Sequence, residues 1–365
     1  RPFFQRVVQH PHSYSRRAGN TVSRIQSIDT MRVIAIIAVM AIHTNPFTDQ
    51  PEHVGASLDL ATVVNQLARF AVPFFFIMSG YFWAQKVTEP RAVYKPTLDM
   101  VKRAALIFVV WSLFYLLETR LIESFASGAP GPVDQILLNI KKAASNLFNT
   151  SLQGTKAHLW FLPALIFSVI IAAVLIRLKY EGLLLLVAVV FYIVALAGGP
   201  YSNTPLGFHI HFNFRNGPFI SLLFFVTGYF MRRYTPGPHW LRSGVLLACA
   251  GIVLHFIELW VLNARWGTSM AQDFVLGTYP FGVGLAMIAL SNPRCLNFTP
   301  AATIGPLVLG IYASHYIFVD LLKSFDTKFA GGWMWSIFYI AAVFLLSYLL
   351  VRLLARFSMT RKIVS

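Results

Sequence analysis

The run Ser27-Ile28-Asp29-Thr30-Met31-Arg32-Val33-Ile34-Ala35-Ile36-Ile37-Ala38-Val39-Met40-Ala41-Ile42-His43 is apolar except for ionisable groups near its two ends. At about 100° per residue, Arg32 and His43 fall within about 20° of each other on one helix face and about 16 Å apart along the axis. Asp29 lies on nearly the same face, one turn before Arg32. Such a line of polar groups is typical of a membrane helix that lines a polar cavity. The alternative is that Arg32 snorkels to a headgroup and His43 sits at the opposite interface.

The composition of the whole chain indicates a polytopic membrane protein. Of its 365 residues, 56% are hydrophobic and only 12% are charged, which is too little polar surface for a soluble protein of this length. No ten-residue segments alternate strictly, so the predicted class is all-α rather than a barrel. The net charge of +16 does not require nucleic acid as a partner, because the placement of the charge in the loops decides its meaning. Cys249 and Cys295 show neither metal-ligand spacing nor a disulfide framework.

Hydrophobic segments of roughly the length that crosses a bilayer, about 20 residues, occur ten times along the chain. We predict spans at 28–46, 61–84, 101–122, 159–178, 182–198, 218–234, 243–262, 274–291, 304–323 and 334–356. The expected organisation is a cytoplasmic N-terminal segment (1–26), a ten-helix membrane domain (27–357) and a cytoplasmic tail (358–365). Residues 1–24 are polar and rich in arginine, so we expect no cleavable signal peptide.

Lysine and arginine are concentrated in alternate connections. They cluster at both termini and after the second, fourth, sixth and eighth spans, whereas the first connection, 47–60, contains none. The positive-inside rule therefore places both termini in the cytoplasm, which an even number of spans allows. The longest outward connection contains a moderately amphipathic stretch, Val133–Leu147, which we expect to lie as a helix on the outer interface.

Two further features of the connections and span ends are informative. The fifth connection, 199–217, is rich in Gly, Pro, Asn and aromatic residues and carries His209, His211 and Arg215. Such a loop either forms the floor of a polar substrate site or simply connects two spans. The ends of spans two and six echo each other, with Ser79-Gly80 and Thr227-Gly228 at matching places. Small residues at these positions allow a close backbone approach, and seven residues are too few to indicate a duplication.

Ionisable side chains gather at two depths of the predicted spans. Each costs at least a few kcal/mol in lipid unless it is paired or faces water, so their convergence predicts a polar site. The outer group comprises His43, Arg69, Glu118, His158, His255, Glu258, His315 and Asp320, and the inner group comprises Arg32, Lys102, Arg103 and Arg232.

Single residues of the outer group have structural alternatives. His43 is either a general base or a hydrogen-bonded core histidine. Glu118 either orients His43 or pairs with Arg69 or Arg120. His255 and Glu258, three apart on one helix face, are placed to pair with each other. The chain has no zinc-binding pattern, P-loop, dinucleotide loop or Gly-x-Ser-x-Gly elbow, which disfavours metal, phosphoryl and hydride chemistry.

An ordered set of motifs resembles the membrane acyltransferase-3 family. The motifs are Arg32-x10-His43, Arg69-x3-Pro73-Phe74-Phe75-Phe76-Ile77-Met78-Ser79-Gly80-Tyr81-Phe82, Lys102-Arg103, His158-Leu159-Trp160-Phe161-Leu162 and Gly310-Ile311-Tyr312-Ala313-Ser314-His315. They are collinear over about residues 27–355 and are most similar to small stand-alone members of the kind that acetylate enterobacterial common antigen.

The resemblance implies transfer of an acyl group, usually acetyl, from acyl-CoA to a hydroxyl of an envelope glycan or glycolipid at the inner (plasma) membrane. It implies essential roles for Arg32 and His43 and no metal. The inner cations and Ser79 are then expected to bind acyl-CoA (acetyl-CoA): Arg32, Lys102, Arg103 and Arg232. The pantetheine arm is of the same order of length as the separation between Arg32 and His43.

On this interpretation His43 removes the proton of the acceptor hydroxyl, with Glu118 or Glu258 holding its tautomer and Arg69 facing the oxyanion or the acceptor. Acceptor-binding candidates are His158, Trp160, His255, Glu258, Tyr312 and His315. A covalent acyl-histidine is an alternative to base catalysis. A transporter or flippase that moves a small polar substrate or a lipid-linked glycan, without forming a bond, is the alternative function.

Overall fold

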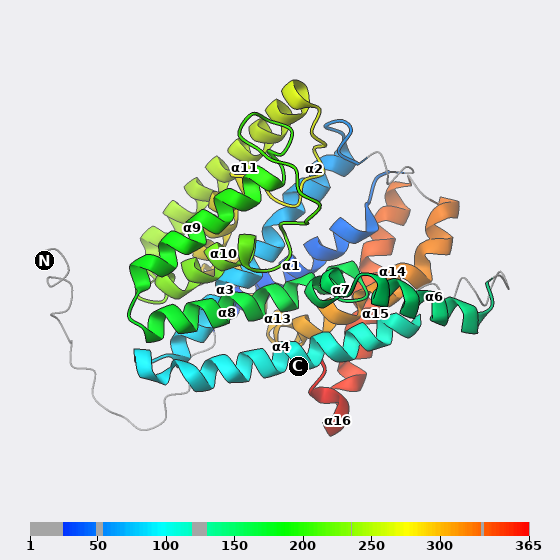
Figure 1. Ribbon diagram of the computed structural model, residues 1–365, viewed down its shortest axis with the longest axis horizontal. Coiled ribbons are helices and arrows are strands. Elements are labelled where there is room, and N and C mark those ends of the chain that lie inside the picture. Colours follow the sequence, from blue (N-terminus) through cyan, green and yellow to red (C-terminus); the bar gives the residue numbers. More distant parts are fainter. Residues whose placement is uncertain (1–24, 49–53, 119–129, 235, 330–331, 365) are drawn as a thin grey trace, which may run out of the picture.

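The computed structural model describes residues 25–48, 54–118, 130–234, 236–329 and 332–364, and these form a bundle of helices (Figure 1). Most of the expected N-terminal segment, and the last residues of the expected third span, lie outside the described residues. The elements are α1 (Gln26–Thr44), α2 (Leu60–Leu67), η2 (Ala68–Phe70), α3 (Ala71–Lys86), η3 (Pro90–Val93), α4 (Tyr94–Glu118), α6 (Pro132–Ser145), α7 (Leu147–Gln153), η4 (Ala157–Trp160), α8 (Phe161–Arg177), α9 (Glu181–Gly198), α10 (Pro218–Met231), α11 (Pro238–Trp266), α12 (Thr278–Leu290), η5 (Arg294–Leu296), α13 (Ala301–Ile304), η6 (Gly305–Leu307), α14 (Val308–Phe329), α15 (Trp333–Leu354) and α16 (Ser358–Arg361).

The predicted all-α polytopic class is confirmed. Within the described residues, eight helical segments are long and apolar enough to cross a membrane, and α10 and α12 are shorter apolar helices. These ten segments occupy the ten predicted positions, although only eight have the full length of a span. α4 begins at Tyr94, well before the predicted start at residue 101, and Pro96 falls in its first turn, where proline is tolerated.

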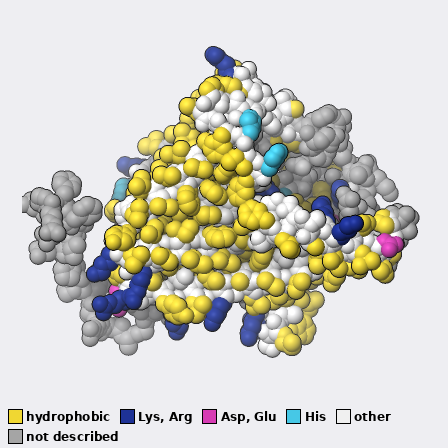
Figure 2. Space-filling view, viewed as in Figure 1, with side chains coloured by type: hydrophobic (Ala, Val, Ile, Leu, Met, Phe, Trp, Pro, Cys, Tyr) yellow, Lys and Arg dark blue, Asp and Glu magenta, His cyan; other side chains and the backbone are white. Residues whose placement is uncertain are grey.

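Large apolar side chains cover much of the outer surface. Leu246 on α11 is 72% exposed and Phe338 on α15 is 57% exposed, as expected for helices that face lipid. Figure 2 shows a broad apolar face with Lys and Arg side chains gathered along its lower edge. This distribution resembles an apolar belt with a basic rim.

The second predicted span is interrupted. Instead of one helix over 61–84, α2 passes into the 3₁₀ turn η2 before α3 begins. Pro73 has no backbone N–H to donate to the carbonyl of Arg69, so a regular α-helix cannot continue through this turn. Arg69 consequently lies in a break in the helix, and its side chain is largely buried.

The two echoed motifs lie against each other where α3 and α10 pack, an approach that their small residues allow. A methyl group added at Gly80 would lie 1.9 Å from the Phe225 carbonyl oxygen, and one at Gly228 would lie 1.9 Å from that of Ile77. The two glycines therefore meet the opposite backbone reciprocally, and no larger residue fits at either position.

α1 packs against α3, α12, α13, α14 and α15, so both ends of its polar line are enclosed by other helices. The amphipathic stretch predicted after residue 133 is helical, as α6, and it is followed by a separate short helix, α7. In Figure 1 these two helices run beside α4 and α8. The side of the membrane on which they lie stays a prediction.

Candidate active site

The two ends of the polar line on α1 have different environments. Arg32 donates a 3.1 Å hydrogen bond to Asp29, as their shared face predicts, and its guanidinium carbon lies 4.9 Å from the centroid of the Phe82 ring. His43 lies in the last turn of α1, next to Asn45, which ends the helix in a left-handed conformation. The helix thus carries a cation at one end and an imidazole at the other.

A cavity of about 550 Å³ runs along α1 from its basic end. Three of the side chains predicted to bind the acyl donor, Arg32, Ser79 and Arg103, line it. Beyond them its walls are largely apolar and include Phe75 and Phe161, so the cavity combines cations at one end with an apolar interior. Such a shape suits a ligand with an anionic head and a thin, less polar arm.

The other predicted donor-binding cations lie outside this cavity. Lys102 is exposed, and Arg232 is exposed beside the Tyr81 ring. A second hollow of about 500 Å³ adjoins the cavity and shares Lys86, Pro96 and Asp99 with it. Arg91 and Lys95 add two more cations to its lining.

The cavity does not reach His43. The nearest lining residues are Val39, about one turn before His43 on α1, and Tyr312 on α14. The polar line on α1 was expected to face a polar cavity, and in the described part of the chain this cavity is lined by Arg32 but not by His43. Phe161 and Tyr312, whose ring centroids are 5.6 Å apart, lie at this end of the cavity.

His43 belongs to a cluster of aromatic rings formed with residues of α14 and η4. The Tyr316 hydroxyl and His43 Nδ1 are hydrogen-bonded at 3.0 Å, and the His315 ring centroid lies 5.4 Å from that of His43. His158 stacks on Tyr316 with a centroid distance of 4.6 Å and an interplanar angle of 23°. The fold thus brings together His43, His158 and His315, which the sequence placed in three different spans.

The carboxylates predicted to orient His43 are not its partners. Tyr316 occupies Nδ1, and neither Glu118 nor Glu258 forms a described hydrogen bond with the imidazole. Glu258 instead accepts the backbone N–H groups of Leu276 and Gly277 and the Tyr201 hydroxyl. In these contacts neither carboxylate orients His43, because depth along a helix says nothing about which face the neighbouring helix presents.

Glu118 lies near a different ion pair. Lys156 pairs with Asp320, and its ammonium lies 5.2 Å from the centroid of the Tyr316 ring. Glu118 is within electrostatic range of both members of this pair, and its Oε2 atom is buried without a hydrogen-bond partner. These charges therefore border the ring cluster on the side of Tyr316.

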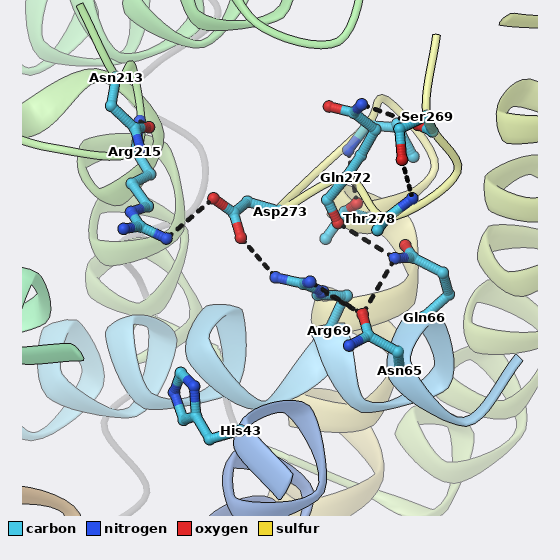
Figure 3. Close-up of polar contacts among 12 residues, drawn as sticks. His43, Asn65, Gln66, Arg69, Asn213, Arg215, Ser269, Gln272, Asp273 and Thr278 are labelled. Atoms are coloured by element: carbon cyan, nitrogen blue, oxygen red, sulfur yellow. Dashed lines mark hydrogen bonds and ion pairs between the residues drawn. The ribbon is translucent and has the colours of Figure 1, made fainter. Parts of the chain in front are cut away.

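A second group of charges lies on the other side of His43, where the imidazole in Figure 3 points toward two ion pairs. Asp273 accepts hydrogen bonds from Arg69 at 2.5 Å and from Arg215 at 3.2 Å. Burial alone would raise the pKa of the Asp273 carboxyl, but the two guanidinium groups outweigh burial and hold that pKa below its usual value. Asp273 is therefore an ionised bridge between two arginines.

The two arginines differ in the donors that they have left. All three guanidinium nitrogens of Arg69 are engaged, since Nε and Nη2 bond to Asn65 and Nη1 bonds to Asp273. A guanidinium has five N–H groups, so Arg69 keeps two after these three hydrogen bonds, and its predicted role of facing the oxyanion or the acceptor stays a prediction. Arg215 uses Nη1 alone for Asp273, and its guanidinium carbon lies 5.8 Å from the centroid of the Trp160 ring.

His255 and Glu258 do not pair with each other. Each forms hydrogen bonds to segments that adjoin this charged group. His255 is completely buried and bonds to Gln66 at 3.0 Å and Thr278 at 3.1 Å. Both residues thereby fasten the connection between α11 and α12, which carries Asp273. Neither residue forms a described hydrogen bond with His43 itself.

Of the remaining acceptor-binding candidates, Tyr312 donates its hydroxyl hydrogen bond to the carbonyl of His158. Trp160 lies between Arg215 and the Phe76 ring. The residues missed by the sequence analysis are Tyr316, Asp273 and Lys156. Tyr316 had a usable signal, because positions 312, 315 and 316 share one helix face.

The site thus contains the His43 imidazole, with one ring nitrogen hydrogen-bonded to Tyr316 and with ion pairs nearby. It lies close to the end of a cavity whose other end is lined by arginines. Among the described residues, no group of three or more His, Cys, Asp or Glu side chains is arranged to hold a metal ion. The fold and this site define a multi-pass membrane protein with polar chemistry buried between its helices.

The chain belongs to the acyltransferase 3 family, described as an acyltransferase domain, whose profile matches residues 25–352. It is 30% identical over 215 residues to an "Amino-acid racemase" of Enterococcus faecalis, covering 55% of this chain and 27% of the relative. It is 28% identical over 222 residues to a "Serine/alanine racemase" of Enterococcus gallinarum, covering 57% of this chain and 29% of the relative. The chain thus matches little more than a quarter of these curated relatives, and no solved structure matches it.

Proposed function

We propose that this protein is an O-acyltransferase of the inner (plasma) membrane that moves an acyl group, acetyl in the first place, from cytoplasmic acyl-CoA to a hydroxyl of an envelope glycan or glycolipid. The observation that carries the proposal is the cavity along α1, which begins at Arg32 and Arg103 and ends about one turn from His43. Membership of the family supports acyl transfer. The motif order, which is similar to that of stand-alone members acetylating enterobacterial common antigen, supports an acetyl donor and a glycan acceptor.

In the proposed reaction the phosphates of acyl-CoA bind at the cationic mouth, and the pantetheine arm extends along the apolar part of the cavity. The nucleotide end lies in the adjoining hollow, beside Arg91 and Lys95. Because the cavity ends at Phe161 and Tyr312, these side chains must shift for the thioester to reach His43.

His43 then removes the proton of the acceptor hydroxyl, whose oxygen attacks the thioester carbonyl carbon. The C–S bond breaks, and the leaving thiolate takes the proton from the imidazolium, so that the products are an ester and free CoA thiol. Arg215, which has guanidinium donors left, is positioned to bind the acceptor, with Arg69 and Asp273 holding it in place.

The function is tested with purified protein in lipid nanodiscs, given acetyl-CoA and a panel of envelope glycan acceptors. Release of CoA thiol that depends on the acceptor, with an acetyl ester detected on the glycan by mass spectrometry, is the expected result. A transporter or flippase would leave acetyl-CoA intact under the same conditions. Intact acetyl-CoA with every acceptor of the panel would therefore count against the proposal.

The proposed orientation places both termini and the cavity mouth in the cytoplasm, in agreement with the basic edge in Figure 2. Reporter fusions at residues 52 and 365 are expected to map to opposite sides of the membrane. If both reporters were active on the same side, this topology would be wrong, and the cavity mouth would not be assigned to the cytoplasm.

Replacing Arg103 by alanine is expected to weaken acetyl-CoA binding. A hydrogen bond to a charged group contributes about 1.5–3 kcal/mol, which corresponds to an increase in Kd of roughly 10-fold or more. Lys102→Ala is the matched control, because Lys102 is the residue just before Arg103 and carries the same charge but lies outside the cavity. Calorimetry on both variants measures the effect, and equal affinities for Arg103→Ala and wild type would rule out this contact.

A further inference from the structure

The histidines around Tyr316 have their N–H groups directed to backbone carbonyls. His315 Nδ1 lies 2.6 Å from the Tyr312 carbonyl oxygen, and His158 Nε2 lies 3.2 Å from that of Ala313. A carbonyl oxygen only accepts, so these nitrogens must be the donors. The two remaining nitrogens, His315 Nε2 and His158 Nδ1, are buried without partners. The tautomers of both histidines are therefore fixed by the backbone of α14.

Among the described residues, no backbone carbonyl accepts a hydrogen bond from His43 in this way. Its described hydrogen bond joins Nδ1 to the Tyr316 hydroxyl, a group that can donate or accept. With Nδ1 occupied, only Nε2 is left for a substrate hydroxyl. An imidazole can take a proton at Nε2 only if its own hydrogen is on Nδ1. The productive state of His43 thus requires Tyr316 to accept from Nδ1–H.

Neighbouring side chains restrict the Tyr316 ring, so that its hydroxyl stays next to His43 Nδ1. Its ring lies between His158, at 4.6 Å, and His43, at 4.8 Å between centroids. The Lys156 ammonium lies over the same ring, 5.2 Å from its centroid, and pairs with Asp320, one turn further along α14. The ion pair and the stacked histidine restrict the rotation of the tyrosine, so its hydroxyl oxygen stays in front of Nδ1.

We infer that Tyr316 is the positioning residue of His43: it accepts the Nδ1–H hydrogen bond of the imidazole and leaves the Nε2 lone pair for the acceptor hydroxyl. Both the role in turnover and the direction of this hydrogen bond rest on the proposed function, but the tautomer can be measured without any substrate. The two parts can therefore be tested separately.

The tautomer is tested by solid-state NMR of the full-length protein in lipid, with its ten histidines labelled with ¹⁵N. The His43 signals are assigned from their loss in His43→Gln. We expect a protonated Nδ1 and an unprotonated Nε2 in the wild type, and a mixture of both tautomers in Tyr316→Phe. A wild-type His43 protonated at Nε2, or an unchanged tautomer in Tyr316→Phe, would overturn the inference even if no acyl transfer were ever observed.

The kinetic test compares Tyr316→Phe with Tyr339→Phe. Tyr339 on α15 is also buried and donates a hydrogen bond to α14, at the Val319 carbonyl, so it controls for the loss of one tyrosine hydroxyl. Tyr316→Phe is expected to lower kcat by up to about 100-fold, the lower end of what a general base contributes, with KM unchanged. Wild-type kcat in Tyr316→Phe, in an enzyme whose wild-type form transfers acetyl groups, would exclude the positioning role and leave the proposed function standing.

Discussion

His43→Ala is expected to lower acetyl transfer by about 10²–10⁴-fold, the range that general acid–base catalysis contributes. A base acts in the transition state rather than in binding, so the loss appears in kcat. Acetyl-CoA affinity should stay near that of the wild type, because the cavity ends at Val39 and Tyr312 and does not include His43. CoA-thiol release and calorimetry on the same preparation separate the two effects.

The matched control for this variant is His239→Ala, which removes an exposed histidine at the start of α11. It should leave turnover and affinity unchanged. Near-normal turnover in His43→Ala would overturn the proposed mechanism. Loss of acetyl-CoA binding together with turnover would show instead that His43 belongs to the donor site.

Asp273→Asn is expected to have the largest effect on stability. The substitution keeps the shape of the side chain but leaves Arg69 and Arg215 beside each other without a countercharge. Breaking a buried ion pair costs about 3–5 kcal/mol and an exposed one about 0–1. The Asp273 side chain is 31% exposed, so we expect a loss of about 2–3 kcal/mol, between these limits.

Thermal unfolding in detergent checks this effect, with Glu181→Gln as the control. Glu181 pairs with Arg233 at the surface, where both side chains are at least one-third exposed, so its removal should cost at most about 1 kcal/mol. Equal unfolding temperatures for the two variants would show that the Asp273 bridge contributes no more to stability than a surface ion pair does.

The stability that the Asp273 carboxylate contributes is expected to decrease at acid pH. The pKa of Asp273 is lowered in the folded protein, so its contribution to stability is fully present above the pKa of an unfolded aspartate, about 3.9. It is lost as the pH falls through the lower, folded value. The difference in unfolding midpoint between wild type and Asp273→Asn should therefore be constant near neutral pH and shrink below about pH 4.

Hydrophobicity and charge in the sequence predicted much of the architecture. Ten apolar segments, the helical nature of the stretch after residue 133, the shared face of Asp29 and Arg32, and the close approach allowed at Gly80 and Gly228 all follow from local patterns. These features depend on helix periodicity, on the cost of polar groups in lipid and on the absence of a Cβ atom. Each of them is a property of one segment or of one repeated motif.

The partners of the ionisable residues depended on the tertiary structure. Arg32, Arg103, His43, His158 and His315 could be chosen from the sequence because charge in an apolar helix stands out. The hydrogen-bond partner of His43 could not be chosen in this way, because helix packing decides it. The α14 face that carries Tyr312 and His315 also presents Tyr316 to His43. Glu118 instead lies within electrostatic range of Lys156 and Asp320. The carboxylate partner of Arg69 likewise depends on tertiary structure, because a loop over 200 residues away supplies Asp273. Periodicity along one helix gives the depth and face of a side chain, but contacts between helices determine its chemistry.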